Sequence, residues 1–138
     1  MIAEQINKIT STLPKTVALI AVSKTKPVSD LQEAYDAGQR AFGENKVQEL
    51  VDKAEVLPKD IHWHLIGHLQ TNKVKYIAPF VHLIHAVDSL KLLVEINKQA
   101  EKNERSIDVL LQFHIAQEET KFGLSLEEAQ ELIESDAF

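Results

Sequence analysis

Short apolar segments rich in β-branched residues alternate about five times with amphipathic segments, and this alternation restricts the fold more than any other feature. An apolar run of strand length followed by apolar residues at helical spacing predicts a strand and then a helix. Successive units of this kind form right-handed crossovers around a parallel sheet. The expected strands are residues 16–23, 40–43, 61–66, 81–86 and 107–115.

Two α/β architectures accommodate such units, an open doubly wound sheet and part of a (β/α)8 barrel. No glycine-rich phosphate loop follows the first strand, where Ser23-Lys24-Thr25-Lys26-Pro27 stands instead, and this disfavours a nucleotide-binding sheet. A closed barrel takes about 200 residues or more, whereas this chain has 138. We therefore predict a parallel TIM-barrel-type fold with about five of the eight units, as a truncated barrel in a single domain over residues 1–138.

Composition argues against several classes of partner. The net charge of −6 leaves no basic surface of the kind that nucleic acid requires. No apolar run reaches the roughly 18 residues that span a bilayer, so we expect no membrane partner. Without cysteine there are no disulfides and no thiolate chemistry. The first residues, which include Glu4, lack a signal-peptide core, and this favours a cytoplasmic location.

Lys24 stands at the carboxyl end of the first expected strand, where α/β folds place their active groups. The uncharged run Thr16–Ser23 suits a strand buried on both faces, and Pro27 closes the segment. Desolvation at such a place lowers the pKa of a lysine by up to about 3–5 units and makes the neutral, nucleophilic amine common. Two alternatives stay open: Lys24 as an ordinary surface lysine, and Lys26 as the reactive one.

Two further side chains have more than one interpretation. Trp63 alternates with its neighbours along an expected strand, which predicts packing beneath the helices more than contact with a ligand. Glu44 either pairs with a nearby lysine or favours the N-terminus of the following helix, and the second interpretation is preferred.

Histidines gather around the third and fourth expected strands. His62 and His64 share one strand face, a pattern that can hold zinc, and His68, His82 and His85 are further potential ligands. No aspartate or glutamate follows at a spacing that completes a hydrolase centre. We therefore expect core or loop histidines with hydrogen-bonded nitrogens, and a zinc site is the alternative.

Five segments, taken together, resemble one family. They match, in order, the signatures of the pyridoxal phosphate homeostasis proteins, which are single-domain relatives of the bacterial alanine racemase barrel. Any one of the segments is a weak signal, but five in sequence order form a specific one. The segments are residues 21–27 (AVSKTKP), 42–49 (FGENKVQE), 63–73 (WHLIGHLQTNK), 85–89 (HAVDS) and 118–123 (EETKFG).

The resemblance implies that Lys24 holds pyridoxal 5′-phosphate (PLP) as a Schiff base and that Asn45 faces the cofactor's ring. It implies a noncatalytic carrier or regulator in intracellular PLP homeostasis, with PLP vitamers as ligands and PLP-dependent enzymes as candidate recipients. Two positions depart from the family pattern: Lys46 stands where tyrosine is common, and His114 where asparagine is common.

Other functions of a lysine at a barrel strand end stay open. A PLP-dependent amino-acid racemase needs an opposed second base, commonly a tyrosine supplied by another domain or subunit. A class I aldolase also uses a barrel lysine, but that lysine normally lies on a later strand. The carrier is the preferred interpretation because Lys24 ends the first strand and because the chain is short.

The largest departure from the family concerns the segments beyond Phe138. In the family, loops after the later strands supply the hydroxyls, backbone amides and arginine that hold the phosphate and the pyridine nitrogen. A phosphate dianion needs several such donors. We therefore expect this chain to bind PLP weakly or not at all, and its open sheet edge to pair with another chain.

Overall fold

Five parallel strands form one sheet in the order β1-β2-β3-β4-β5. The computed structural model describes residues 1–113 and 123–138. Because every neighbouring pair is parallel and consecutive in the chain, the sheet is an arc of a barrel, as the alternating pattern predicts. The strands are β1 Ala21–Val22, β2 Ala41–Glu44, β3 His62–Leu65, β4 Leu83–Val87 and β5 Asp108–Leu111.

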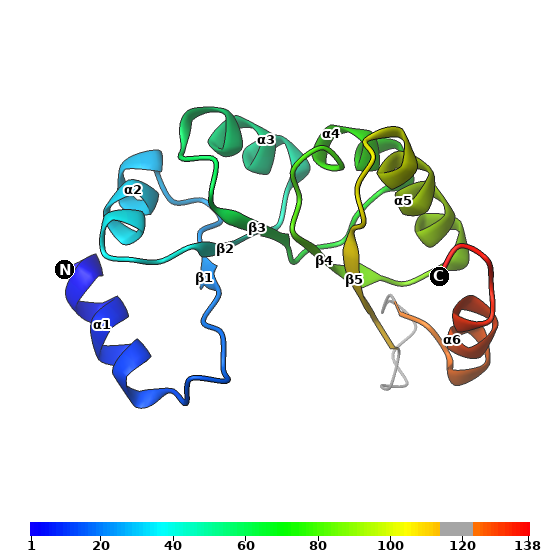
Figure 1. Cartoon of the computed structure of the whole chain (residues 1–138), viewed down its shortest axis with the longest axis horizontal. Helices are drawn as coiled ribbons and strands as arrows, with labels where there is room; N and C mark the ends of the chain where they lie inside the picture. Colours follow the sequence, from blue (N-terminus) through cyan, green and yellow to red (C-terminus); the bar gives the residue numbers. More distant parts are fainter. Residues whose placement is uncertain (114–122) are drawn as a thin grey trace.

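Helices cover one side of this arc (Figure 1). Those between the strands follow one another along the convex side of the sheet, whereas the first and last helices lie at its two ends. None of the described helices is long and apolar enough to cross a membrane. The helices are α1 Ile2–Thr12, α2 Val28–Asp36, α3 Val47–Val56, the 3-10 turn η1 Thr71–Lys73, α4 Val74–Ile77, α5 Leu90–Lys102 and α6 Leu126–Ile133.

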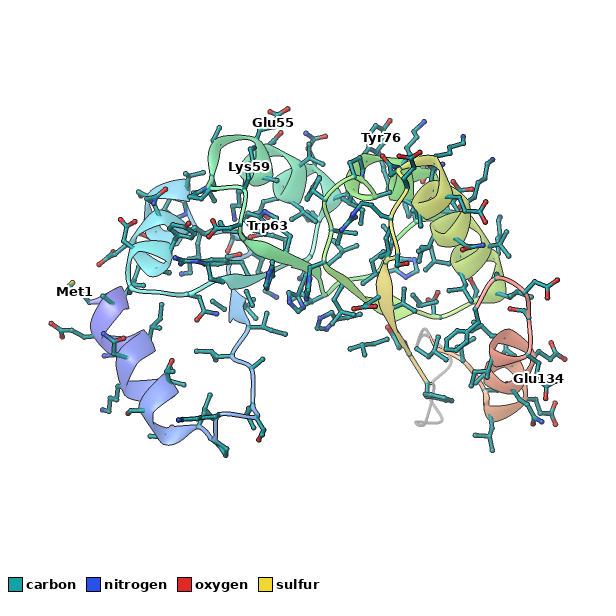
Figure 2. The ribbon with its side chains drawn as sticks, viewed as in Figure 1. Met1, Glu55, Lys59, Trp63, Tyr76 and Glu134 are labelled. Carbon is teal, nitrogen blue, oxygen red and sulfur yellow. The ribbon has the colours of Figure 1, made fainter. Side chains whose placement is uncertain are left out.

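The apolar core lies between the sheet and these helices. Phe42 of β2 stands opposite Trp63 of β3, and the centroids of their rings are 5.9 Å apart. Both are buried, together with Leu50 of α3. Burying one such side chain stabilises the fold by roughly 1.5–3 kcal/mol. The expected packing of Trp63 beneath the helices is therefore confirmed. Figure 2 labels it beside α3.

The opposite face of the sheet carries alternate residues of the same strands. In a complete barrel this face lines a packed interior. Here Val22 is 55% exposed and Leu110 is 48% exposed. His64 is also on this face, but it is buried among other histidines.

The first strand is much shorter than the sequence predicts. Only Ala21 and Val22 pair with β2, and the chain before them starts with a turn in which the Val17 N–H donates to the Pro14 carbonyl over 3.0 Å. Among the described residues β1 has one strand neighbour, β2. Val17 is 49% exposed and Val22 is 55% exposed, so the apolar run is not buried on both faces. Before β1, the chain is held near β2 by a side chain: the buried Gln39 amide donates to the Leu19 carbonyl over 2.7 Å.

Candidate functional site

Lys24 lies in a turn at the carboxyl end of β1. The turn is closed by a hydrogen bond from the Lys26 N–H to the Ser23 carbonyl, at 3.1 Å. The Lys24 side chain is exposed, so the predicted desolvation of its amine is wrong, and no described residue makes a hydrogen bond or ion pair with its Nζ. The position at the strand end agrees with the sequence prediction, but the lysine follows the strand instead of belonging to it. It is an unengaged amine at the edge of the sheet where α/β sites form.

Both chain neighbours of Lys24 are anchored to side chains of β2 and α3. On one side, the Ser23 hydroxyl donates to Oε2 of Glu44, and the Ser23 carbonyl accepts from Nζ of Lys53 over 2.7 Å. On the other side, the Thr25 N–H donates to Oε2 of Glu49 over 2.6 Å.

The three charged side chains that hold this turn, Glu44, Glu49 and Lys53, also contact one another. Nζ of Lys53 lies 2.9 Å from Oε2 of Glu44 and 2.8 Å from Oε2 of Glu49, so its three protons have three acceptors when the Ser23 carbonyl is included. Glu44 is fully buried and Lys53 nearly so. The preferred interpretation of Glu44, as a charge at a helix N-terminus, is therefore wrong: it pairs with Lys53.

Glu49 is held in its ionised form. The hydrogen bond from Lys53 lowers the pKa of the Glu49 carboxyl, and the Thr25 N–H and the Lys53 charge act in the same direction. Partial burial of Glu49 opposes this shift without reversing it. The resulting carboxylate is a strong acceptor for the Thr25 amide.

Asn45 follows β2 directly and is half-buried. A Cβ on Gly67, at the end of β3, would lie only 2.7 Å from the Asn45 carbonyl oxygen, so glycine is what allows the two backbones to approach. Asn45 lines a cavity of about 460 Å³ with Lys46, His68 and Lys73. Lys24 and Asn45 thus follow the neighbouring parallel strands β1 and β2 at the carboxyl end of the sheet, although no hydrogen bond joins them.

The histidines form pairs on the face of the sheet away from the helices. Nδ1 of His64 lies 2.9 Å from Nε2 of His85, and the rings of His62 and His82 stack at 4.4 Å. Burial, followed by the neighbouring histidine charges, lowers the pKa of His64 to about 4, and burial also lowers the pKa of His85. Within residues 1–113 and 123–138, no group of three or more His, Asp or Glu side chains is arranged to hold a metal ion.

Sequence reasoning missed two of the residues that hold the turn of Lys24, namely Glu49 and Lys53. A Glu followed four positions later by a Lys on one helix is a recognisable pair, and this spacing was the available signal. His114 and most of the segment 118–123 lie outside the described residues.

Residues 1–137 match the family described as "Alanine racemase, N-terminal domain". The chain is 46% identical over 117 residues to the pyridoxal phosphate homeostasis protein of Aquifex aeolicus, covering 84% of this chain and 51% of that protein. It is 43% identical over 123 residues to the protein of that name from Escherichia coli K12, covering 86% and 53%. The chain thus spans about half the length of the curated relatives that it matches.

Solved structures show the same relationship. PipY of Synechococcus elongatus PCC7942, with PLP bound, superposes with a TM-score of 0.87 at 38% identity, over 96% of this chain and 62% of PipY. Alanine racemase of Clostridium difficile 630 superposes with a TM-score of 0.78 at 16% identity, over 96% of this chain and 36% of the racemase. The second likeness concerns the fold alone.

Proposed function

Because the chain belongs to the family of the alanine racemase N-terminal domain, we propose that it binds pyridoxal 5′-phosphate through Nζ of Lys24 and serves intracellular PLP homeostasis. The observation that carries this proposal is the exposed, unengaged amine of Lys24 at the carboxyl end of β1. PLP supplies an aldehyde, with which a lysine amine condenses. Lys24 provides that amine on a turn that its neighbours hold in place.

Asn45 is proposed as the residue beside the ring of the cofactor. It follows β2, the strand next to β1, and the close approach of Gly67 restricts its backbone. Its amide can donate and accept hydrogen bonds at this edge of the sheet.

The described residues fit the aldehyde end of PLP better than its phosphate. Phosphate sites commonly use arginine, and the chain has only Arg40 and Arg105. Each precedes a strand and therefore lies at the amino ends of the strands, opposite the carboxyl ends where Lys24 lies. Arg40 donates to the Tyr35 carbonyl, and Arg105 donates to the carbonyls of Ala78 and Val81. We therefore propose that the 138 residues bind PLP more weakly than the longer relatives do.

We propose a carrier function without catalysis. The curated relatives are named for homeostasis, and the alternative, a racemase, needs a second base facing Lys24. The chain has two tyrosines. Tyr35 donates to Asp60, which precedes β3 and therefore lies at the amino end of the strands. Tyr76 belongs to α4, in the layer of helices outside the sheet. Neither supports a base opposite Lys24.

The recipients of the cofactor and the association of the chain with itself are also proposed. PLP-dependent enzymes are proposed recipients of the cofactor. Self-association is proposed through the outer edges of β1 and β5, each of which has one strand neighbour among the described residues. A single domain over residues 1–138 and a cytoplasmic location stay predictions from the sequence.

The test is covalent labelling. The 138-residue chain is mixed with PLP, its absorbance is recorded, and borohydride reduction followed by peptide mapping locates the label. We expect the label on Lys24, its loss in Lys24→Met, and its retention in the matched variant Lys26→Met. A label that stays in Lys24→Met rejects the assignment. Exchange of the α-deuterium of alanine by the loaded protein supports the racemase instead.

A further inference from the structure

We propose that Glu49 and Lys53, together with the buried Glu44, are positioning residues that fix the turn carrying Lys24 for attachment of the cofactor. This inference deepens the proposed function and rests on it. The three side chains are called the turn anchor below. None of them is proposed to contact the cofactor, and they act through the backbone on either side of Lys24.

The turn anchor makes hydrogen bonds to the residues on both sides of Lys24. Ser23 is bonded through its hydroxyl to Glu44 and through its carbonyl to Lys53. Its N–H also donates to the Gly43 carbonyl at 2.9 Å, which ties it to β2. Thr25 is bonded through its N–H to Glu49. The residue between them therefore has a fixed backbone and an unengaged side chain.

Thr25 has an unusual backbone conformation. Its φ is +64°, in the left-handed region that β-branched residues rarely adopt. Such a conformation persists only where surrounding contacts over-determine it, and it is characteristic of functional sites. Three hydrogen bonds hold it here: the Thr25 N–H donates to the Glu49 carboxylate, the Thr25 hydroxyl donates to the Lys24 carbonyl over 2.6 Å, and the Lys26 N–H closes the turn onto the Ser23 carbonyl. Of these, the bond to Glu49 is the one that ties Thr25 to α3.

Placing the charged side chains of the turn anchor in the interior costs free energy of desolvation. Buried ion pairs contribute little net stability compared with apolar side chains of the same size. Oε1 of Glu44 is buried and has no hydrogen-bond partner among the described residues. A requirement for a fixed Lys24 explains why charges occupy this place.

The chemical consequence is that Lys24 reaches the geometry of reaction with a smaller loss of conformational entropy. An amine whose backbone is fixed loses less freedom when it reaches the bound aldehyde, which raises the rate of attachment. The anchor leaves Nζ of Lys24 unengaged, so positioning does not compete with reaction.

The experiment compares Glu49→Ala with its matched control Glu55→Ala, an exposed residue of the same helix, on the whole 138-residue chain. Amide hydrogen exchange is read at Thr25 and Ser23. The rate at which PLP and borohydride label Lys24 is read by peptide mapping, with Lys26 as the internal reference. Glu49→Gln, which keeps an oxygen acceptor, is the second variant, and circular dichroism verifies that each variant is folded.

In Glu49→Ala we expect faster exchange at Thr25, unchanged exchange at Ser23, and Lys24 labelling slowed at least about fivefold relative to Lys26. Glu49→Gln should lie between this variant and the wild type, and Glu55→Ala should match the wild type. If Lys24 is labelled selectively and equally fast in Glu49→Ala and wild type, the positioning inference is overturned and the proposed function stands. If wild-type Lys24 takes no more label than Lys26, the proposed function is overturned, whatever happens at Thr25.

Discussion

Nζ of Lys53 lies 2.9 Å from Oε2 of Glu44 in the interior between α3 and the sheet, where Glu44 is fully buried. The two residues link helix and strand directly behind the turn of Lys24. Their pairing makes the stability of this region sensitive to either charge.

Replacing Lys53 with Met should destabilise the chain by about 3–5 kcal/mol, because it leaves the Glu44 carboxylate buried without its partner. Urea unfolding measures the change. The matched control is Lys98→Met, an exposed lysine of α5, for which we expect a change within about 0.5 kcal/mol. The double variant Glu44→Gln, Lys53→Met should recover part of the loss. Equal stabilities for Lys53→Met and Lys98→Met would contradict the prediction.

The pH dependence of stability should contain a contribution from Glu49. Its folded pKa lies below the ordinary value of 4.5, chiefly because Lys53 donates a hydrogen bond to it. The unfolded state therefore binds the proton more readily, and stability falls as pH drops from the ordinary value through the lower folded one. Urea unfolding between about pH 3 and 6 should show a shallower fall in Glu49→Gln than in wild type. Glu55→Gln should keep the wild-type slope.

The buried His64 predicts a second, separate pH dependence. Its pKa is lowered from 6.5 to about 4, mainly by burial and then by His85, His82 and His62. Protonation thus favours the unfolded state, and stability should fall as pH drops from about 6.5 towards 4. Each pKa unit corresponds to about 1.4 kcal/mol, and partial solvent access reduces the loss to the order of 2 kcal/mol.

The variant His64→Gln should remove most of this slope, because glutamine keeps a polar side chain for His85 but does not titrate. Urea unfolding at several pH values between about 4 and 7 is the measurement. An identical slope in His64→Gln and wild type assigns the dependence to other groups.

The sequence predicts the large-scale features of this structure well, because they follow from local chemistry. The spacing of hydrophobic residues and the turn residues between them identify the parallel strand–helix units. Pro27 and the apolar run before it place Lys24 at a strand end. The length of β1 could not be predicted, since hydrophobicity does not reveal that a strand pairs with a single neighbour in the part of the chain that the structure describes. The link from Thr25 to Glu49 was equally inaccessible, because it depends on how α3 packs against a turn far away in sequence.

Gly67 offers a test of how Asn45 is held. A Cβ there would meet the Asn45 carbonyl oxygen at 2.7 Å, and this is a backbone atom that cannot rotate away. Gly67→Ala should therefore force the end of β3 away from Asn45 and destabilise the chain by about 1–3 kcal/mol. Gly43→Ala is the comparison, because the three atoms nearest its Cβ would be Ile side-chain atoms, at 3.2–3.3 Å, which can adjust.

Urea unfolding gives the energies, and the amide chemical shift of Asn45 reports the local movement. We expect Gly67→Ala to be the more damaging of the two variants and to move the Asn45 signal. If Gly43→Ala costs as much, or if the Asn45 amide stays unchanged in Gly67→Ala, the close approach of the two backbones is not what positions Asn45.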